Sequence, residues 1–373
     1  MKIAFLFKRD SHFKAVKSTA LRVCVQYNCE PVFIGIDSDY SPSNESYSIT
    51  YIDKYDLSCL SEYDYVIACL GGYLLNQVVS ALKDTDTKVI SIFPGIVSHY
   101  QLDAFISRLN ADQVWLNSKA DLDLYSRICK LMNVKNNGLL YGMSWIDSKL
   151  VSKGNLNSYS GPKKAIFFEQ TAVTPDLNSK RNLKSALIET FERNRDVFFK
   201  YKIRKNTSDT YFTDLRLSVS KFENVDVIDS LTDKDIKEAT YFFSVSSSAI
   251  VEGLILNKIC YILDSKFLDL DSKEFFNCSG LKLTGNITDK KSNNVNKKWL
   301  FYRVKKPLHE VDLLNIKKVA FPLYLKKRNV YKIRFFVTKL SLKKPILLKI
   351  LFRKSRLITI QKALEYLGYA NDK

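Results

Sequence analysis

Short apolar runs alternate with stretches of helical periodicity along most of this chain, and that alternation limits the folds open to it. In the first half the apolar runs are Lys2–Phe7, Pro31–Ile36, Tyr65–Cys69, Lys88–Phe93, Gln113–Asn117 and Gly138–Met143. Helical spacing follows several of them, as over Ser11–Tyr27 and Ala120–Met132. Strands apolar on both faces and separated by helices predict a parallel sheet covered on two sides.

The polar stretch SKGNLNSYSGPKK, residues 152–164, interrupts this pattern, and a second alternating unit follows it. Its expected strands are Ala165–Phe168, Val197–Ile203, Val225–Ile228, Tyr241–Ser244 and Ile259–Leu263. A chain of 373 residues is long enough for two cores, because single cores stop growing near roughly 250–300 residues. We therefore predict an α/β protein with two Rossmann-like domains, residues 1–151 and 165–316, that face each other across a cleft and are joined by the linker 152–164.

The net charge of +19 is concentrated near the end of the chain. Fourteen Lys and Arg, and no Asp or Glu, lie between Lys317 and Arg356, interleaved with Leu, Ile, Phe and Val. We interpret residues 317–373 as a basic amphipathic segment of short helices that binds an anionic membrane surface. Nucleic acid is the less favoured partner, and lysine stems that cover a helical face of the core are the structural alternative.

Other features favour a cytoplasmic protein, peripheral on the inner face of the membrane. The N-terminus MKIAFLFKRD has no signal-peptide pattern, and no uncharged apolar stretch reaches the roughly 18 residues that cross a bilayer. The seven cysteines form no CxxC pair and mostly lie in apolar runs, as expected for reduced core residues.

Residues 241–263, YFFSVSSSAIVEGLILNKICYIL, predict a strand, a hydroxyl-rich turn and a helix. The turn carries Ser246, Ser247 and Ser248, and Glu252 lies about one helical turn further on. The N–H groups of a helix N-terminus can bind a phosphate, and a carboxylate at Glu252 could accept hydrogen bonds from ribose hydroxyls. The alternative is that the serines cap an ordinary helix and Glu252 is a solvated surface acid.

Polar residues also end the first two expected strands of the second domain. Glu169 and Gln170 end the first, and Lys202 and Arg204 share one face of the next strand with Lys200. Lys202 and Arg204 could pair with phosphate or carboxylate, although a solvated basic edge strand would carry the same residues. Together with the serine turn, these residues predict a site for an anionic nucleotide.

Several functional classes lack their motifs. There is no GxGxxG after the first strand, no GxxxxGK[ST] and no GxSxG, so a dehydrogenase, a P-loop NTPase and an α/β hydrolase are disfavoured. The histidines His12, His99 and His309 lack metal-ligand spacing. Four Asp-x-Asp pairs, among them Asp121/Asp123, mostly reflect chance in an Asp-rich chain. We expect neither a metal nor a cofactor.

The chain resembles bacterial GT-B glycosyltransferases of capsule and lipopolysaccharide loci. The resemblance rests on PGIVSHYQLDAFISR from Pro94 to Arg108, on FxEQ followed by Pro175 and Arg181, on Lys202 and Arg204, on SSxxxE at Ser247, Ser248 and Glu252, and on Asp10-Ser11. It covers roughly residues 1–265 and is closest to a group linked with nonulosonic, sialic-acid-type sugars. Lys202-Ile203-Arg204 stands where the better-known bacterial sialyltransferases have a His-Pro pair, which leaves UDP- and GDP-sugars open beside the favoured CMP-sugar.

This resemblance implies an inverting, metal-independent transferase that moves a sugar from a nucleotide donor to a surface polysaccharide or a lipid-linked glycan. For the catalytic base we favour Asp10 or His12, with His99 and Asp103 behind them. The turns Gly71-Gly72 and Pro94-Gly95 would border the cleft. A nucleotide-sugar epimerase of the same architecture and a non-catalytic basic protein that binds polyanions are the alternatives.

Overall fold

The computed structural model describes residues 1–38, 40–42, 47–132, 134–146, 163–170, 176–204, 209–263, 274–289 and 295–319. Contacts divide the chain into unit 1, Met1–Ile146 with the chain from Tyr302 on, and unit 2, Asp147–Phe301. The linker 152–162, Pro175 and the basic segment beyond residue 319 lie outside the described residues. The predicted helices of that segment therefore stay a prediction.

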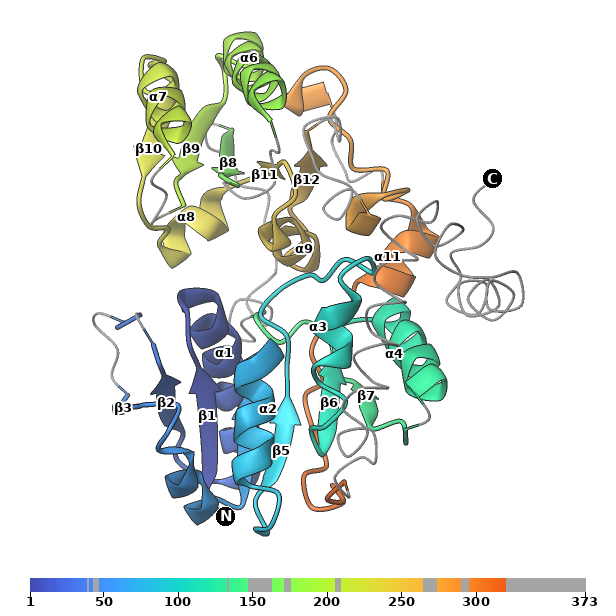
Figure 1. Ribbon diagram of the computed structural model, residues 1–373. Helices are drawn as coiled ribbons and strands as arrows, with labels where there is room; N and C mark the ends of the chain where they lie inside the picture. The colour runs from blue at the N-terminus through green and yellow to red at the C-terminus, as the bar shows by residue number, and fades with distance from the viewer. Residues whose placement is uncertain are drawn as a thin grey trace. The chain divides into compact units, whose positions relative to one another are not determined.

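Unit 1 is built on a parallel sheet of seven strands in the order β3-β2-β1-β4-β5-β6-β7 (Figure 1). The strands are β1 (Ile3–Phe7), β2 (Val32–Ile36), β3 (Ile49–Ile52), β4 (Tyr65–Ala68), β5 (Lys88–Ser91), β6 (Gln113–Leu116) and β7 (Gly138–Leu140). Six were predicted within a few residues. The edge strand β3 was missed because its ITYI sequence is mostly solvent-accessible and lacks an apolar run.

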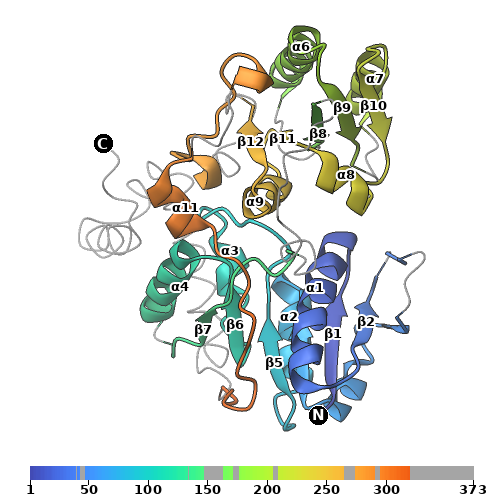
Figure 2. The same ribbon diagram turned by 180° about the vertical axis from the view of Figure 1, so that it is seen from behind.

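Helices cover both faces of this sheet, as the opposite views of Figures 1 and 2 show. The elements are α1 (Asp10–Tyr27), the 3-10 helix η1 (Leu57–Glu62), α2 (Gly72–Ala81), α3 (Leu102–Ile106) and α4 (Lys119–Met132). On one face, Phe13 of α1 packs edge-on against Phe7 of β1. Leu75 and Val78 of α2 share a cluster with Ala4 and Leu6 of β1, which point to the other face.

Residues 304–319, after α11, return to unit 1 and run along it as an extended strap. The backbone N–H of Leu308 donates to the Tyr141 carbonyl, and Gln26 of α1 exchanges two hydrogen bonds with the backbone of Val311. The second domain was predicted to end at residue 316, whereas the contacts end unit 2 at Phe301. The partners lie 285 positions apart in the sequence, a separation that local patterns cannot reveal.

The strap is anchored near the amino ends of the unit 1 strands. The Lys318 ammonium donates to the carbonyls of Leu82, Thr85 and Thr87. Asp112 accepts a hydrogen bond of 2.7 Å from the N–H of Val319. The basic segment therefore begins at the end of unit 1 opposite the carboxyl ends of its strands.

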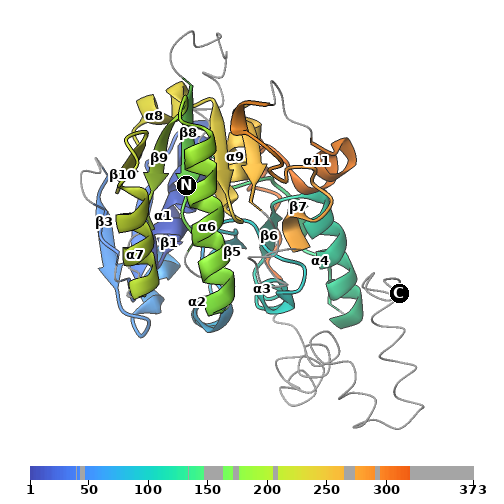
Figure 3. The ribbon, with the colours of Figure 1, turned by 90° about the horizontal axis from the view of Figure 1, so that it is seen from above.

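Unit 2 contains a parallel sheet of five strands in the order β10-β9-β8-β11-β12. Its strands are β8 (Lys164–Phe168), β9 (Phe198–Lys202), β10 (Val225–Ile228), β11 (Tyr241–Ser244) and β12 (Ile259–Ile262), all of them predicted. Its helices are α6 (Leu177–Arg193), α7 (Thr210–Val219), α8 (Asp233–Glu238) and α9 (Ser248–Ile255), with η3 (Ile287–Asp289) and α11 (Lys297–Arg303) further on. Figure 3 shows α6 and α7 side by side, and both pack on the face of Phe199 and Tyr201.

Helix α9 packs tightly on the opposite face. A Cβ built on Gly253 would lie 2.6 Å from the Phe242 ring of β11 and 2.8 Å from the Cys260 sulfur of β12. A larger side chain at residue 253 would therefore push α9 away from the sheet. The glycine lets the helix that begins at the serine turn lie close to the strands that precede and follow it.

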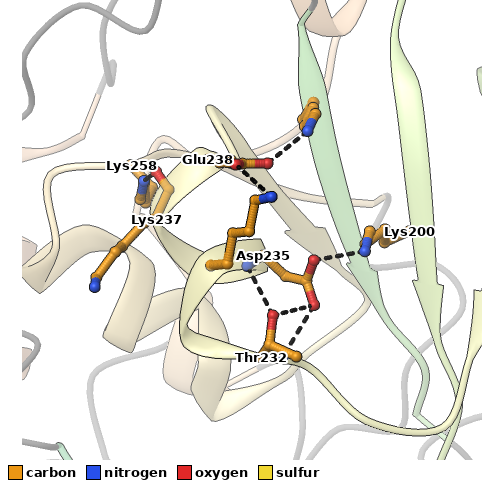
Figure 4. A network of polar contacts seen from close by, with 8 residues as sticks. Lys200, Thr232, Asp235, Lys237, Glu238 and Lys258 are labelled. Atoms are coloured by element: carbon orange, nitrogen blue, oxygen red, sulfur yellow. Dashed lines mark hydrogen bonds and ion pairs between the residues drawn. The ribbon is translucent and has the colours of Figure 1, made fainter.

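Ion pairs fasten α8 to the sheet (Figure 4). Lys200 of β9 donates to Asp235 at 2.5 Å, and Lys164 of β8 donates to Glu238 at 2.6 Å. Thr232 and Asp235 form a reciprocal capping box. Burial alone would raise the pKa of Asp235, but its hydrogen bonds from Lys200 and Thr232 lower it to about 2. The solvated-edge interpretation of the basic strand is wrong, because β9 lies between β8 and β10 and Lys200 is paired.

Candidate functional site

In unit 2 the serine turn forms the N-terminus of α9 as predicted. Ser246 and Ser247 are buried, Ser248 is half-buried, and the Ser247 hydroxyl caps the helix by accepting a hydrogen bond of 3.2 Å from the N–H of Ala249. Glu252 is only 6% exposed, so its alternative as a solvated surface acid is wrong. The turn thus combines one capping hydroxyl with two further serines at the positive end of a helix.

Glu169, at the end of β8, holds a buried cluster together. Its carboxylate accepts hydrogen bonds from the Tyr201 hydroxyl (2.9 Å), the Arg204 N–H (2.8 Å) and two nitrogens of Arg216 (3.0 and 2.5 Å). Its hydrogen bond from Arg216 raises the pKa of that guanidinium, and burial followed by the Glu169 charge raises the pKa of Tyr201 well above its ordinary value. The carboxylate is committed to protein donors.

This cluster positions Arg204 rather than leaving Glu169 open to a ligand. Arg216 also donates to the Arg204 carbonyl at 3.1 Å, so both backbone polar groups of residue 204 are held while its side chain is exposed. The Lys202 ammonium donates to the carbonyl of Ile203 at 2.7 Å, and Gln170 is half-buried beyond Glu169. Sequence analysis missed Arg216, which lies 47 positions from Glu169 on α7.

The predicted residues of unit 2 gather at one end of the sheet. Phe168 of β8 is in register with Lys202 of β9 on one side and with Ser244 of β11 on the other. The Ser244 hydroxyl donates to the Phe168 carbonyl at 2.7 Å, which joins the two strand ends. The carboxyl ends of three neighbouring strands therefore carry the predicted polar residues: Lys202 and Arg204 at β9, Gln170 at β8 and the serine turn at β11.

In unit 1 the first turn of α1 places Asp10 and His12 beyond β1. Asp10 is exposed, whereas His12 is half-buried, and its Nδ1 is buried without a partner in the described ranges of the chain. Burial, and then the charges of Arg108, Arg9 and Lys8, lower the pKa of His12 to about 4. The imidazole is therefore neutral at neutral pH and able to accept a proton.

Arg108 is a buried cation beneath the Gly71-Gly72 turn. It is 4% exposed, donates to the carbonyls of Leu70 (3.0 Å), Ile92 (3.5 Å) and Ala104, and lies 4.0 Å from the centre of the Phe93 ring. No carboxylate contacts it within the described residues, and its Nε has no partner there. Burial lowers its pKa to about 10, which still leaves it charged at neutral pH.

His99 and Asp121 form a second polar pair in unit 1. The His99 Nε2 lies 3.0 Å from a carboxylate oxygen of Asp121, which is buried in the first turn of α4. Asn117, at the end of β6, donates to the Gly95 carbonyl at 3.0 Å and so fixes the Pro94-Gly95 turn. Asp103 lies in the first turn of α3. The Asp-x-Asp pattern at Asp121 gave no signal of this partnership.

Two further features bear on the site. No three His, Cys, Asp or Glu side chains within the described ranges come together as a set of metal ligands, and metal independence stays a prediction. In the same part of the chain, no helix is long and apolar enough to span a bilayer.

Two parallel α/β units are the architecture of GT-B proteins, and known structures of this fold are similar to the chain. A crystal structure described as "putative UDP-N-acetylglucosamine 2-epimerase from Listeria monocytogenes" aligns with a TM-score of 0.53 at 11% identity, over 81% of this chain and 86% of that one. The S. aureus MnaA-UDP co-structure gives 0.52 at 13% identity, over 81% and 86%. A UDP-GlcNAc 2-epimerase from Neisseria meningitidis bound to UDP-GlcNAc gives 0.53 at 12%, over 76% and 87%.

The chain has the two-domain GT-B fold. Residues 45–302 match the model of the family described as "Putative glycosyltransferase (DUF6716)", and because this match covers more than half of the chain, the protein belongs to that family. No curated protein matches the sequence.

Proposed function

We propose that this protein transfers a sugar from a nucleotide-activated donor to a hydroxyl group of an acceptor glycan. Membership of a family described as glycosyltransferases supports glycosyl transfer. The observation that carries the proposal is the polar set at the carboxyl ends of β9, β8 and β11, where two basic side chains and a serine-capped helix N-terminus follow adjacent strands. Such a set suits the phosphate of a nucleotide sugar.

In this proposal the donor binds to unit 2. The N-terminus of α9 with Ser246 and Ser248 holds the phosphate, Arg204 and Lys202 neutralise its charge, and Glu252 and Gln170 contact the nucleoside. Glu169 acts as a positioning residue, because it fixes the backbone from which Arg204 extends. The structures of S. aureus MnaA with UDP and of the Neisseria epimerase with UDP-GlcNAc support a nucleotide sugar as the substrate class.

We assign the acceptor hydroxyl to unit 1. In an inverting transfer, the hydroxyl oxygen bonds to the anomeric carbon, the bond from that carbon to the donor phosphate breaks, and a base takes the hydroxyl proton. His12 suits this role because it is neutral at physiological pH and its Nδ1 has no structural partner in the described chain. The rival candidates for the base are Asp10, His99 in its pair with Asp121, and Asp103.

The finer proposal is a CMP-activated, sialic-acid-like donor and a surface polysaccharide or lipid-linked acceptor. Calorimetry with CMP, UDP and GDP tests the nucleotide, and one of the three should bind at least tenfold more tightly than the others. Incubation of the matching nucleotide sugar without an acceptor then separates transferase from epimerase. A sugar epimer formed under those conditions would overturn the transferase assignment. Salt-dependent binding of DNA or RNA with no nucleotide-sugar turnover would favour a polyanion-binding protein instead.

We also propose that the basic segment attaches the protein to the inner face of the cytoplasmic membrane. Lys318 of the strap is held by the carbonyls of Leu82, Thr85 and Thr87. The cations beyond residue 319 therefore supply the attraction to the membrane. Truncation after Val319 keeps this anchor and should release the protein from anionic liposomes in co-sedimentation at low salt. Failure of the full-length protein to bind those liposomes would contradict the membrane role.

A further inference from the structure

The N-terminus of α2 carries no side-chain cap in unit 1. Its N-cap is Gly71, and helix α2 begins at Gly72, which has a left-handed φ of +59°. A left-handed residue followed by helical residues turns successive N–H groups toward one concavity, an arrangement that binds anions. The N–H groups of Gly72 and Leu74 meet no acceptor within the described residues. The space beside Gly72 is open, since a Cβ built there has no heavy atom within 4 Å apart from those of its two chain neighbours.

Arg108 lies directly behind this turn. Two of its guanidinium nitrogens would be 3.5 and 3.6 Å from a Cβ built on Gly71, and its buried Nε has no partner in the described chain. A buried cation whose partners are only neutral carbonyls and a ring has lost its hydration without gaining a counter-charge, and an anion beside it offsets that loss. The helix end and the buried arginine are independent features that attract the same kind of ligand.

The neighbouring strand end adds further positive charge. Leu6 of β1 is in register with Ala68 of β4, so Lys8 lies alongside Leu70 as the two strands end. The charges of Lys8, Arg9 and Arg108 all act on His12. Arg108 therefore lies both beside the turn and within electrostatic reach of the neutral His12 imidazole.

We propose that the Leu70–Gly72 turn and the first turn of α2 bind an oxyanion, the phosphate or carboxylate group of the acceptor, with the Arg108 guanidinium beneath them. The assignment of this oxyanion to the acceptor rests on the proposed function, whereas the site itself does not. Bound there, the acceptor is held beside His12, whose role is to take a proton from its hydroxyl. The guanidinium lies within van der Waals reach of a Cβ built on Gly71, and Gly72 supplies the left-handed backbone.

The test uses the full-length protein labelled with nitrogen-15 in glycine, because the chain has only twelve glycines. Inorganic phosphate and, separately, acetate are titrated at constant ionic strength against chloride. The amide signals of Gly71 and Gly72 should shift in a saturable way, whereas the signal of Gly138 in β7 should not. Tighter binding of phosphate assigns a phosphate-bearing acceptor, and tighter binding of acetate assigns a carboxylate.

Variants decide whether the site is the one described. Arg108→Met should weaken anion binding at least tenfold, and so should Gly71→Val, which fills the turn but keeps Arg108 and suits the extended backbone there. If Arg108→Met also shifts the other glycine signals, the fold has changed, and the effect of Gly71→Val on anion binding then decides the question. Lys83→Met removes an exposed cation beyond the C-terminus of α2 and should bind like the wild type.

Two results would overturn the site: no saturable shift with either anion, or shifts unchanged in both variants. Sugar transfer without such shifts would reject the anion site and leave the proposed function standing. Saturable shifts in a protein that turns over no nucleotide sugar would reject the function and leave the site.

Discussion

The carboxyl ends of the two sheets differ in how they treat buried charge. In unit 2 the buried carboxylate of Glu169 receives a full set of donors, among them two nitrogens of Arg216. In unit 1 the buried guanidinium of Arg108 contacts carbonyls and a phenyl ring, and no carboxylate within the described residues.

This difference separates a positioning cluster from a candidate ligand site. A compensated buried pair is expensive to break, so Glu169 and Arg216 hold the end of β9 and present the Arg204 side chain. An uncompensated buried charge lowers the stability of the fold, so another role must account for its presence. Stability alone therefore explains the polar cluster of unit 2 but not Arg108.

The largest effect should come from His12, if the strand end of unit 1 is functional. His12→Ala should reduce turnover by about 10²–10⁴-fold, the usual range for a general base, with nucleotide affinity retained. Because the base must be unprotonated, kcat/KM of the wild type should fall only as the pH drops through about 4, the pKa of His12. His309→Ala, at an exposed position of the strap, is the control. Wild-type turnover in His12→Ala would assign the base to Asp10, His99 or Asp103 instead.

The next effect concerns the stability of unit 2. Glu169→Gln should lower the free energy of unfolding by about 3 kcal/mol, because it leaves Arg216 without its counter-charge. Urea unfolding measures this value. Glu189→Gln breaks an exposed pair with Arg193 and should cost less than about 0.5 kcal/mol. Equal costs for the two variants would remove the distinction between the compensated cluster and an ordinary surface pair.

The helix N-terminus of unit 2 should contribute less than the base. The double change Ser247→Ala and Ser248→Ala should weaken nucleotide binding by about 1–3 kcal/mol, on the scale of lost hydrogen bonds to a charged group. Because Ser247 also caps α9, unfolding must be measured beside calorimetry. Ser218→Ala on α7 is the control, and an unchanged nucleotide affinity in the double variant would exclude this turn from the donor site.

Arg204 tests whether the positioning cluster serves ligand binding. Arg204→Ala should raise the donor KM about tenfold, and Arg204→Lys should restore it only in part because the planar fork is lost. Arg195→Ala removes an exposed arginine before the start of β9 and serves as the matched control. Wild-type kinetics in both Arg204 variants would reduce the Glu169 cluster to a stabilising role.

The smallest effect concerns acid stability. The pKa of Asp235 is lowered in the folded state to about 2 from an ordinary 3.8. Its contribution is therefore present above pH 4 and lost as the pH falls toward 2. Asp235→Asn should flatten this part of the stability curve, measured by thermal unfolding from pH 5 to 2. A curve that keeps its wild-type slope would mean that the Lys200 pair does not stabilise unit 2.

Local sequence patterns were sufficient to predict the two α/β units, eleven of the twelve strands in the described part of the chain, and the place of the polar residues at the strand ends. It could do so because the apolar runs of a doubly covered sheet are a local pattern, and so is the serine turn before α9. The exposed strand β3 lacks that pattern.

Which polar groups are partners became clear only from the three-dimensional fold. Arg216 meets Glu169 from 47 positions away, Asp121 meets His99, and the strap meets α1 from 285 positions away. The fold also shows which buried charges have a partner of opposite charge. Glu169 is enclosed by donors, whereas Arg108 is buried without a counter-ion in the described chain. Partnership and burial depend on where separate strands end in space, and a pattern read along the chain carries no such information.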